Sequence, residues 1–119
     1  MKTVFVNRNI AEIFKTKHFK ADFTMYYDGE KPIYGKAEDP KNLLPVPTYQ
    51  DAIDWFRTKH KIDISPRKIK TINDDKGFRN IFDFVIFKNG VILHSSDKKW
   101  YNYHTALNRA IEKGFELIK

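Results

Sequence analysis

The stretch "FRNIFDFVIFKNGVILHSS", Phe78 to Ser96, decides the fold because it contains the clearest β-hairpin of the chain. Its two apolar runs are joined by Asn89-Gly90, a dipeptide that favours a two-residue type I′ turn. A loop of this length fixes the register, so we expect Ile86 to pair with Leu93. The predicted core face of the hairpin carries Phe82, Phe84, Ile86 and Leu93.

A weaker strand precedes the hairpin. The segment "KIDISPRKIKTI", residues 61–72, alternates poorly between apolar and polar positions. It contains Pro66, whose missing N–H favours an edge strand or a strand with a bulge. The polar stretch "NDDKG" that follows is typical of a turn. We therefore expect an antiparallel sheet with this strand beside the hairpin.

Two amphipathic helices are predicted on either side of these strands. Apolar residues recur at helical spacing over 48–60 and over 102–118. Thr48 is a good N-cap, and Asp51 completes a weaker form of the capping box; Asn102 is the N-cap of the last helix. We expect both helices to cover the better apolar face of the sheet, in αβββα order.

The N-terminal part carries smaller elements. Asn7 or Asn9 would cap a short helix, and Asp28-Gly29 favours a short tyrosine-rich hairpin. The sequence predicts one α+β domain over residues 1–119, in which an antiparallel sheet is packed on one face by two main helices. Its expected parts are a helix plus hairpin at 1–35, an irregular, proline-rich connection at 36–47 and the αβββα portion at 48–119.

The composition indicates a folded, non-secreted protein. Of 119 residues, 41% are hydrophobic and 15% aromatic, with few glycines and prolines, which argues against disorder. No apolar run approaches the length of a membrane span, and the lack of cysteine fits a reducing compartment. We expect a cytoplasmic location.

Nothing in the sequence predicts catalysis, a metal site or a cofactor. The four histidines lack metal-ligand spacing, there is no cysteine, and the glycines are scattered singly, so a phosphate loop is missing. Ser95 and Ser96 follow His94 at a strand end without the glycines of a nucleophile elbow. We therefore expect a protein that is not an enzyme.

The basic residues give the stronger functional signal. The formal net charge is +7, and residues 61–119 hold most of the excess, which favours an anionic partner but also serves solubility. Tryptophans near the basic segments are candidate anchors. The candidate binding residues are Arg57, Lys59, Lys61, Arg67, Lys68, Lys70, Lys98, Lys99, Trp55 and Trp100.

Several segments together resemble a known group of proteins. They are "NIAEIFKTKHF", "MYYDGEKPIYG", "PTYQDAIDWFRTKH" and "YHTALNRAIEKGFELIK". In this order they are similar to a recurrent group of small uncharacterised proteins of Bacteroidota and their phages. The stretch "SPRKIKTINDDKGFRN" lies outside the likeness. The resemblance implies an accessory protein of a phage or mobile element, a class that includes anti-CRISPR inhibitors of host defence. It also implies that the expected cytoplasm is that of a bacterial host.

Three functions are compatible with these observations. The first is a non-enzymatic accessory protein that docks on a host protein or ribonucleoprotein, as an anti-CRISPR-like inhibitor. The second is direct binding of structured or double-stranded RNA, because the αβββα order is similar to that of a double-stranded RNA-binding domain. In that family lysines lie within the last helix, whereas Lys98 and Lys99 precede the cap here. The third is a structural or homo-oligomeric phage component.

Overall fold

The computed structural model describes residues 5–35 and 42–118. The chain divides into two compact units, Met1–Ala52 and Ile53–Lys119. Helix α2, Tyr49–His60, begins in the first unit and ends in the second. The prediction of a single domain over 1–119 therefore stays a prediction. Within the described ranges, no helix combines the length and hydrophobicity needed to cross a bilayer.

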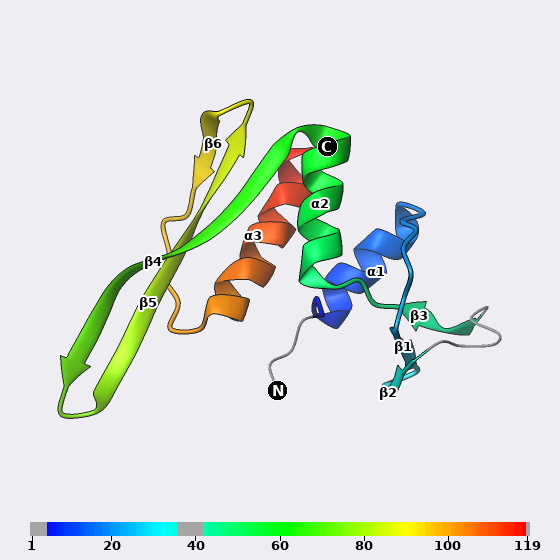
Figure 1. The fold of residues 1–119 in the computed structure, drawn as a ribbon, viewed down its shortest axis with the longest axis horizontal. Helices are drawn as coiled ribbons and strands as arrows, with labels where there is room; N and C mark the ends of the chain where they lie inside the picture. Colours follow the sequence, from blue (N-terminus) through cyan, green and yellow to red (C-terminus); the bar gives the residue numbers. More distant parts are fainter. Residues whose placement is uncertain (1–4, 36–41, 119) are drawn as a thin grey trace. The chain divides into compact units, whose positions relative to one another are not determined.

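The first unit combines a short helix with a small antiparallel sheet (Figure 1). Helix α1 spans Arg8–Thr16 and is capped by Asn7. Strands β1 (Met25–Asp28), β2 (Lys31–Tyr34) and β3 (Leu44–Pro45) lie in the order β2-β1-β3. The connection predicted to be irregular at 36–47 therefore contributes a strand, and its residues 36–41 lie outside the described ranges.

The turn between β1 and β2 differs by one residue from the expected dipeptide. Asp28 pairs with Lys31, so the loop consists of Gly29 and Glu30. Gly29 has a φ of +63° and Glu30 does not have a positive φ. This is the pattern of a type II′ turn, which takes glycine at its first central position.

The second unit contains the predicted antiparallel sheet, in the order β4-β5-β6. Its strands are β4 (Ile62–Asp74), β5 (Gly77–Lys88) and β6 (Val91–Ser95). Asn89 and Gly90 both have positive φ values, of 52° and 79°, as a type I′ turn requires. The two alternatives drawn from Pro66 are both confirmed, since β4 is an edge strand and has a bulge between Lys68 and Lys70.

The predicted register of β5 and β6 holds next to the turn and then shifts. Phe87 pairs with Ile92, but Ile86 pairs with His94 and not with Leu93. Leu93 is the extra residue of a β-bulge, so the expected pair and the expected core position of Leu93 were wrong. Its side chain is 44% exposed, whereas His94 takes the face of the buried Ile86.

The two main helices cover the better apolar face, as predicted. Helix α3 spans Tyr103–Leu117 and contacts both β4 and β5 (Figure 1). The C-terminal turns of α2 join this layer, because the rings of Phe56 and Phe115 lie 5.0 Å apart. Buried residues on the sheet side include Ile64, Phe84 and Ile86. The second unit is therefore a two-layer α+β structure.

The helix caps follow the sequence. The N–H of Asp51 donates to Thr48 Oγ1 at 3.0 Å, and the N–H of Thr48 donates to Asp51 Oδ2 at 3.2 Å. The N–H of Thr105 donates to Asn102 Oδ1 at 3.0 Å. Both predicted caps are confirmed, and the first is a reciprocal capping box.

Gly114 sets how closely α3 approaches its neighbours. A Cβ at this position would lie 3.0 Å from Phe56 Cε1 and 3.1 Å from Ile64 Cδ1. Both distances are tighter than ordinary contacts between side-chain carbons. The absence of a side chain at 114 therefore lets α2, α3 and β4 pack together.

We predict that Gly114→Ala lowers the free energy of unfolding by about 1–2 kcal/mol, because overpacking outweighs the gain in helix propensity. The measurement is urea unfolding followed by circular dichroism. Ile64→Val removes the Cδ1 atom that the new methyl group meets, so the double variant should be less destabilised than the sum of the two single changes. An increase in stability for Gly114→Ala alone would contradict the packing.

Candidate functional site

The arginines of this protein are bound to its own carboxylates. Arg67 donates to both oxygens of Asp83, at 2.7 and 3.1 Å. The hydrogen bond to Asp83, with its charge, raises the pKa of Arg67, so this guanidinium stays protonated. All five arginines have such a partner: Arg8 with Glu12, Arg57 with Asp63 and Asp54, Arg67 with Asp83, Arg79 with Asp74, and Arg109 with Glu112.

The lysines, by contrast, carry unpaired positive charge. Among the lysines that the structure describes, only Lys113 has a carboxylate within 4 Å, that of Glu116 at 3.7 Å. The others in the second unit are exposed. They are Lys59, Lys61, Lys68, Lys70, Lys76, Lys88, Lys98 and Lys99.

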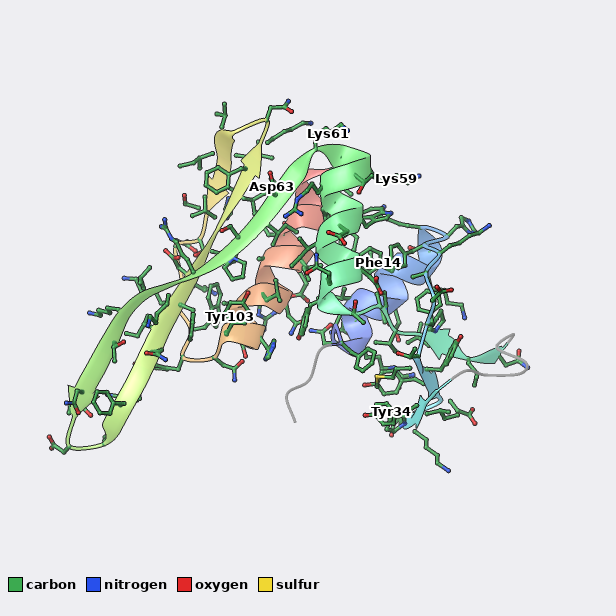
Figure 2. The ribbon with its side chains drawn as sticks, viewed as in Figure 1. Phe14, Tyr34, Lys59, Lys61, Asp63 and Tyr103 are labelled. Carbon is green, nitrogen blue, oxygen red and sulfur yellow. The ribbon has the colours of Figure 1, made fainter. Side chains whose placement is uncertain are left out.

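These lysines fall into two groups, one at the start of β4 and the other from the middle of β4 to the turn that follows it. β4 is 13 residues long, so its ends lie about 40 Å apart. Lys59 and Lys61 lie where α2 meets the start of β4 (Figure 2), and Lys88 pairs with Ile62 at the same end. We call Lys59, Lys61 and Lys88 the corner lysines.

The other group lies on a two-stranded extension of the sheet. β6 pairs only with residues 85–88 of β5, so β4 and β5 continue beyond it as a hairpin (Figure 1). We call residues 67–80 the arm. None of them is buried, and the ring of Phe78 near the tip is 78% exposed. The arm contains five basic residues and two acids: Arg67, Lys68, Lys70, Lys76 and Arg79 against Asp74 and Asp75.

The bulge in β4 separates two of the predicted residues. Lys68 pairs with Phe82, whose ring packs against Tyr103 at the start of α3. Lys70 pairs with Ile81, which points to the opposite face. The arm therefore presents ammonium groups on both faces.

Lys98 and Lys99 lie at the base of the arm. They precede Trp100, whose N–H and C=O both bond Phe82, at 2.9 and 2.7 Å. The segment therefore runs beside β5 directly across from Lys68. Of the predicted residues, the structure brings together Lys68, Lys70, Lys98 and Lys99, and places Arg57, Lys59 and Lys61 elsewhere.

The two tryptophans have different surroundings. Trp55 is half-buried against Phe115, Phe56 and His60, in the helix layer. Trp100 is also half-buried and stacks on Phe84, with ring centroids 5.6 Å apart and an interplanar angle of 16°. Only Trp100 lies beside the arm lysines.

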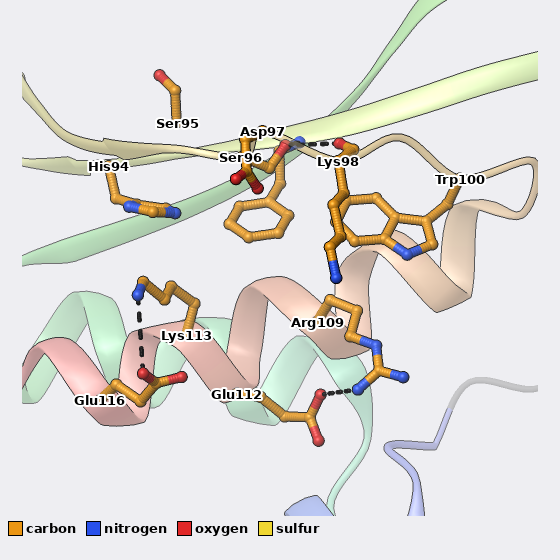
Figure 3. Close-up of a pocket in the computed structure, with 11 residues that line it drawn as sticks. His94, Ser95, Ser96, Asp97, Lys98, Trp100, Arg109, Glu112, Lys113 and Glu116 are labelled. Atoms are coloured by element: carbon orange, nitrogen blue, oxygen red, sulfur yellow. Dashed lines mark hydrogen bonds and ion pairs between the residues drawn. The ribbon is translucent and has the colours of Figure 1, made fainter.

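An open cleft of about 600 Å³ lies between the sheet and α3 (Figure 3). Phe84, Trp100 and His94 supply its aromatic wall. Its charged residues balance: Lys98, Arg109 and Lys113 face Asp97, Glu112 and Glu116. Two of these pairs are within α3, Arg109 with Glu112 at 3.1 Å and Lys113 with Glu116 at 3.7 Å.

Sequence reasoning missed the cleft and the tip of the arm. The cleft depends on the bulge at Leu93, because the bulge brings His94 to the helix side of the sheet. No feature of the sequence predicts this bulge. Lys76 was predicted to lie in a turn, and Phe78 at the start of the hairpin segment. A signal did exist for the arm, because residues 67–80 contain few apolar residues compared with 81–87.

No family model, curated protein or solved structure matches this chain. Within residues 5–35 and 42–118, no three histidine, aspartate or glutamate side chains gather as metal ligands would.

We predict that Trp100→Ala lowers the free energy of unfolding by about 1–3 kcal/mol, because it removes the stack on Phe84 and part of the apolar surface that the stack buries. Trp100→Phe keeps an aromatic partner and should cost less than half as much. Thermal unfolding followed by circular dichroism measures both. Equal stability of the alanine and phenylalanine variants would show that the stack is not formed in solution.

Proposed function

We propose that this protein acts by binding rather than by catalysis, and that its second unit binds the phosphate backbone of structured RNA. The supporting observation is the set of lysines without carboxylate partners on the arm and at its base. Phosphate neutralisation by such side chains supplies most of the affinity of sequence-independent binding. Nothing in the sequence predicts a catalytic group that would compete with this role.

The division between arginine and lysine indicates the kind of recognition. A guanidinium that reads a base or grips a phosphate does so through parallel N–H donors. In this protein Arg67 already uses two such donors on Asp83, and the charges of the other arginines are each paired with a carboxylate. Lysines act as point charges, so binding should follow duplex shape and charge and depend little on base sequence.

The form of the arm suits a groove of a duplex. A groove is bordered by two phosphate backbones, and the arm carries lysines on both of its faces. A-form RNA offers a wide, shallow minor groove, and proteins that read RNA duplexes bind across it. The αβββα order is similar to that of this class of reader, whereas Lys98 and Lys99 precede the cap of α3 and do not lie within the helix as in that class.

The genetic setting implied by the sequence resemblance is part of the proposal. A phage or mobile-element accessory protein that inhibits host defence would meet structured RNA within a host ribonucleoprotein. Binding of the isolated duplex is the simpler property, and it can be measured without knowledge of the host.

We predict that the triple variant Lys68→Gln/Lys70→Gln/Lys76→Gln binds an RNA duplex about tenfold or more weakly than the unmodified protein, because three phosphate contacts are lost. Fluorescence anisotropy with a labelled duplex, at salt concentrations between about 50 and 200 mM, gives the affinity and its salt dependence. The slope of log K against log salt should fall by about two to three in magnitude.

The matched control replaces the corner lysines, as Lys59→Gln/Lys61→Gln/Lys88→Gln. It removes the same charge from the other end of the second unit, and its affinity should stay within about twofold of the unmodified protein. Equal losses for the two triple variants would show that net charge alone drives binding. No binding of the unmodified protein at about 50 mM salt would rule out the proposed function. Binding of a DNA duplex alone would rule out RNA as the partner.

We also predict that Asp83→Asn strengthens RNA binding severalfold, because it releases the guanidinium of Arg67 at the arm. The salt slope should rise by about one in magnitude. Asp63→Asn, which removes the closer of the two carboxylate partners of Arg57 at the other end of β4, is the control and should leave the slope unchanged. The same increase for both variants would place the RNA outside the arm.

A further inference from the structure

The edge strand β6 exposes a run of large apolar side chains. Val91 is 69% exposed, Ile92 59% and Leu93 44%, and residues 89–96 contain no Asp, Glu, Lys or Arg. The opposite edge of the same sheet, β4, carries Pro66, a bulge and lysines, the devices that keep edge strands from pairing. Of these two edge strands, β6 is therefore the one on which a further strand could pair.

The backbone groups of β6 that face outward can be identified. The N–H of Ser96 donates to the C=O of Phe84, so even-numbered residues of β5 bond the β6 side. Val85 and Phe87 turn their backbone groups toward β4, and their partners on β6 are Ser95 and Ile92. The N–H and C=O groups of Ile92 and Ser95 therefore point away from the sheet.

The cleft lies directly beside this edge. His94 and Ser95 of β6 line it on the sheet side, and Lys113 of α3 lines it on the other (Figure 3). The bulge at Leu93 brings His94 to this face, where its ring lies 5.9 Å from that of Phe84. A strand added along β6 would place alternate side chains over this aromatic wall.

We propose that β6 and the cleft bind an extended, uncharged segment of another protein, as a fourth strand of the sheet. Strand addition supplies main-chain hydrogen bonds, and a pocket for alternate side chains supplies selectivity. Cations and anions are equal in number in the cleft, two of the pairs are formed within α3, and β6 carries no charge. A charged side chain at the cleft position would therefore gain no net attraction to offset its desolvation. The ligand therefore carries aliphatic or aromatic residues there. This site is distinct from the arm and does not depend on RNA binding.

The test uses synthetic peptides of about nine residues, the length of a long strand, with blocked ends and threonine alternating with valine. In a Trp55→Phe background the fluorescence of Trp100 reports on the cleft. Saturable binding of the uncharged peptide is expected, with a central tyrosine tolerated and a central glutamate or lysine binding about tenfold more weakly. If no uncharged peptide binds at about 1 mM, or if charged ones bind equally well, the proposal fails.

A pair of variants separates the backbone from the side chain. Ile92→Pro removes an outward N–H without removing a bond to β5, whereas Ile92→Thr keeps that N–H. The proline variant should bind the peptide about tenfold more weakly than the threonine variant. Equal affinities would overturn strand addition.

Hydrogen exchange of the unmodified protein answers the same question if the proline variant does not fold. Peptide at saturation should slow exchange of the Ile92 and Ser95 amides, and unchanged exchange would overturn the proposal. Sedimentation without peptide tests whether a second copy of this protein binds the edge instead. A dimer that Ile92→Pro abolishes would show that a second copy uses this edge, which would also overturn it.

Discussion

The central strand β5 needs hydrogen-bond partners along both of its sides, and the way it finds them arranges the second unit. β4 bonds one side over the whole length of β5. On the other side β6 pairs with residues 85–88. The N–H of Ser96 donates to the C=O of Phe84, and its hydroxyl accepts from the N–H of Phe84. The backbone of Trp100 bonds that of Phe82. These hydrogen bonds hold Trp100 against Phe84 and Lys98 and Lys99 beside β5. They also bring the chain to the start of α3. Where it ends, β5 keeps only one neighbour and the arm begins.

The same arrangement separates the buried residues of the second unit from the unpaired lysines of the arm. The buried side chains of the second unit lie in α2, in α3 and in the parts of β4 and β5 outside the arm, and the arm has none. An exposed ion pair such as that of Arg57 with Asp63 adds little to stability. The ion pair does, however, neutralise a guanidinium. The ammonium groups of the unpaired lysines are then the positive charges that can attract an anionic partner. The acidic residues of this basic protein thereby decide which of its cations are available.

The fold could be predicted from the sequence wherever a short motif, such as a turn dipeptide or an N-cap, is compatible with one local conformation. Asn89-Gly90 fixed a type I′ hairpin, Asn102 and the pair of Thr48 with Asp51 fixed helix starts, and Pro66 marked an edge. The bulge at Leu93 was not predictable, because an alternating pattern is equally compatible with an unbroken register. The candidate basic residues between Arg57 and Lys70 are close in the sequence, but the length of β4 separates them in space. Whether Arg67 has a carboxylate neighbour depends on its cross-strand pairing with Asp83, which sequence spacing does not give.

The arm has one further property that follows from its lack of buried residues. Its constraints are its cross-strand register and the two faces of its strands, so its length is not tied to the packing of the helices. Adding or removing two residues in each strand would preserve which side chains share a face, whereas a change of one would exchange the faces. In evolution or in engineering, the reach of the arm can therefore vary in steps of about 6.6 Å without a compensating change in the core.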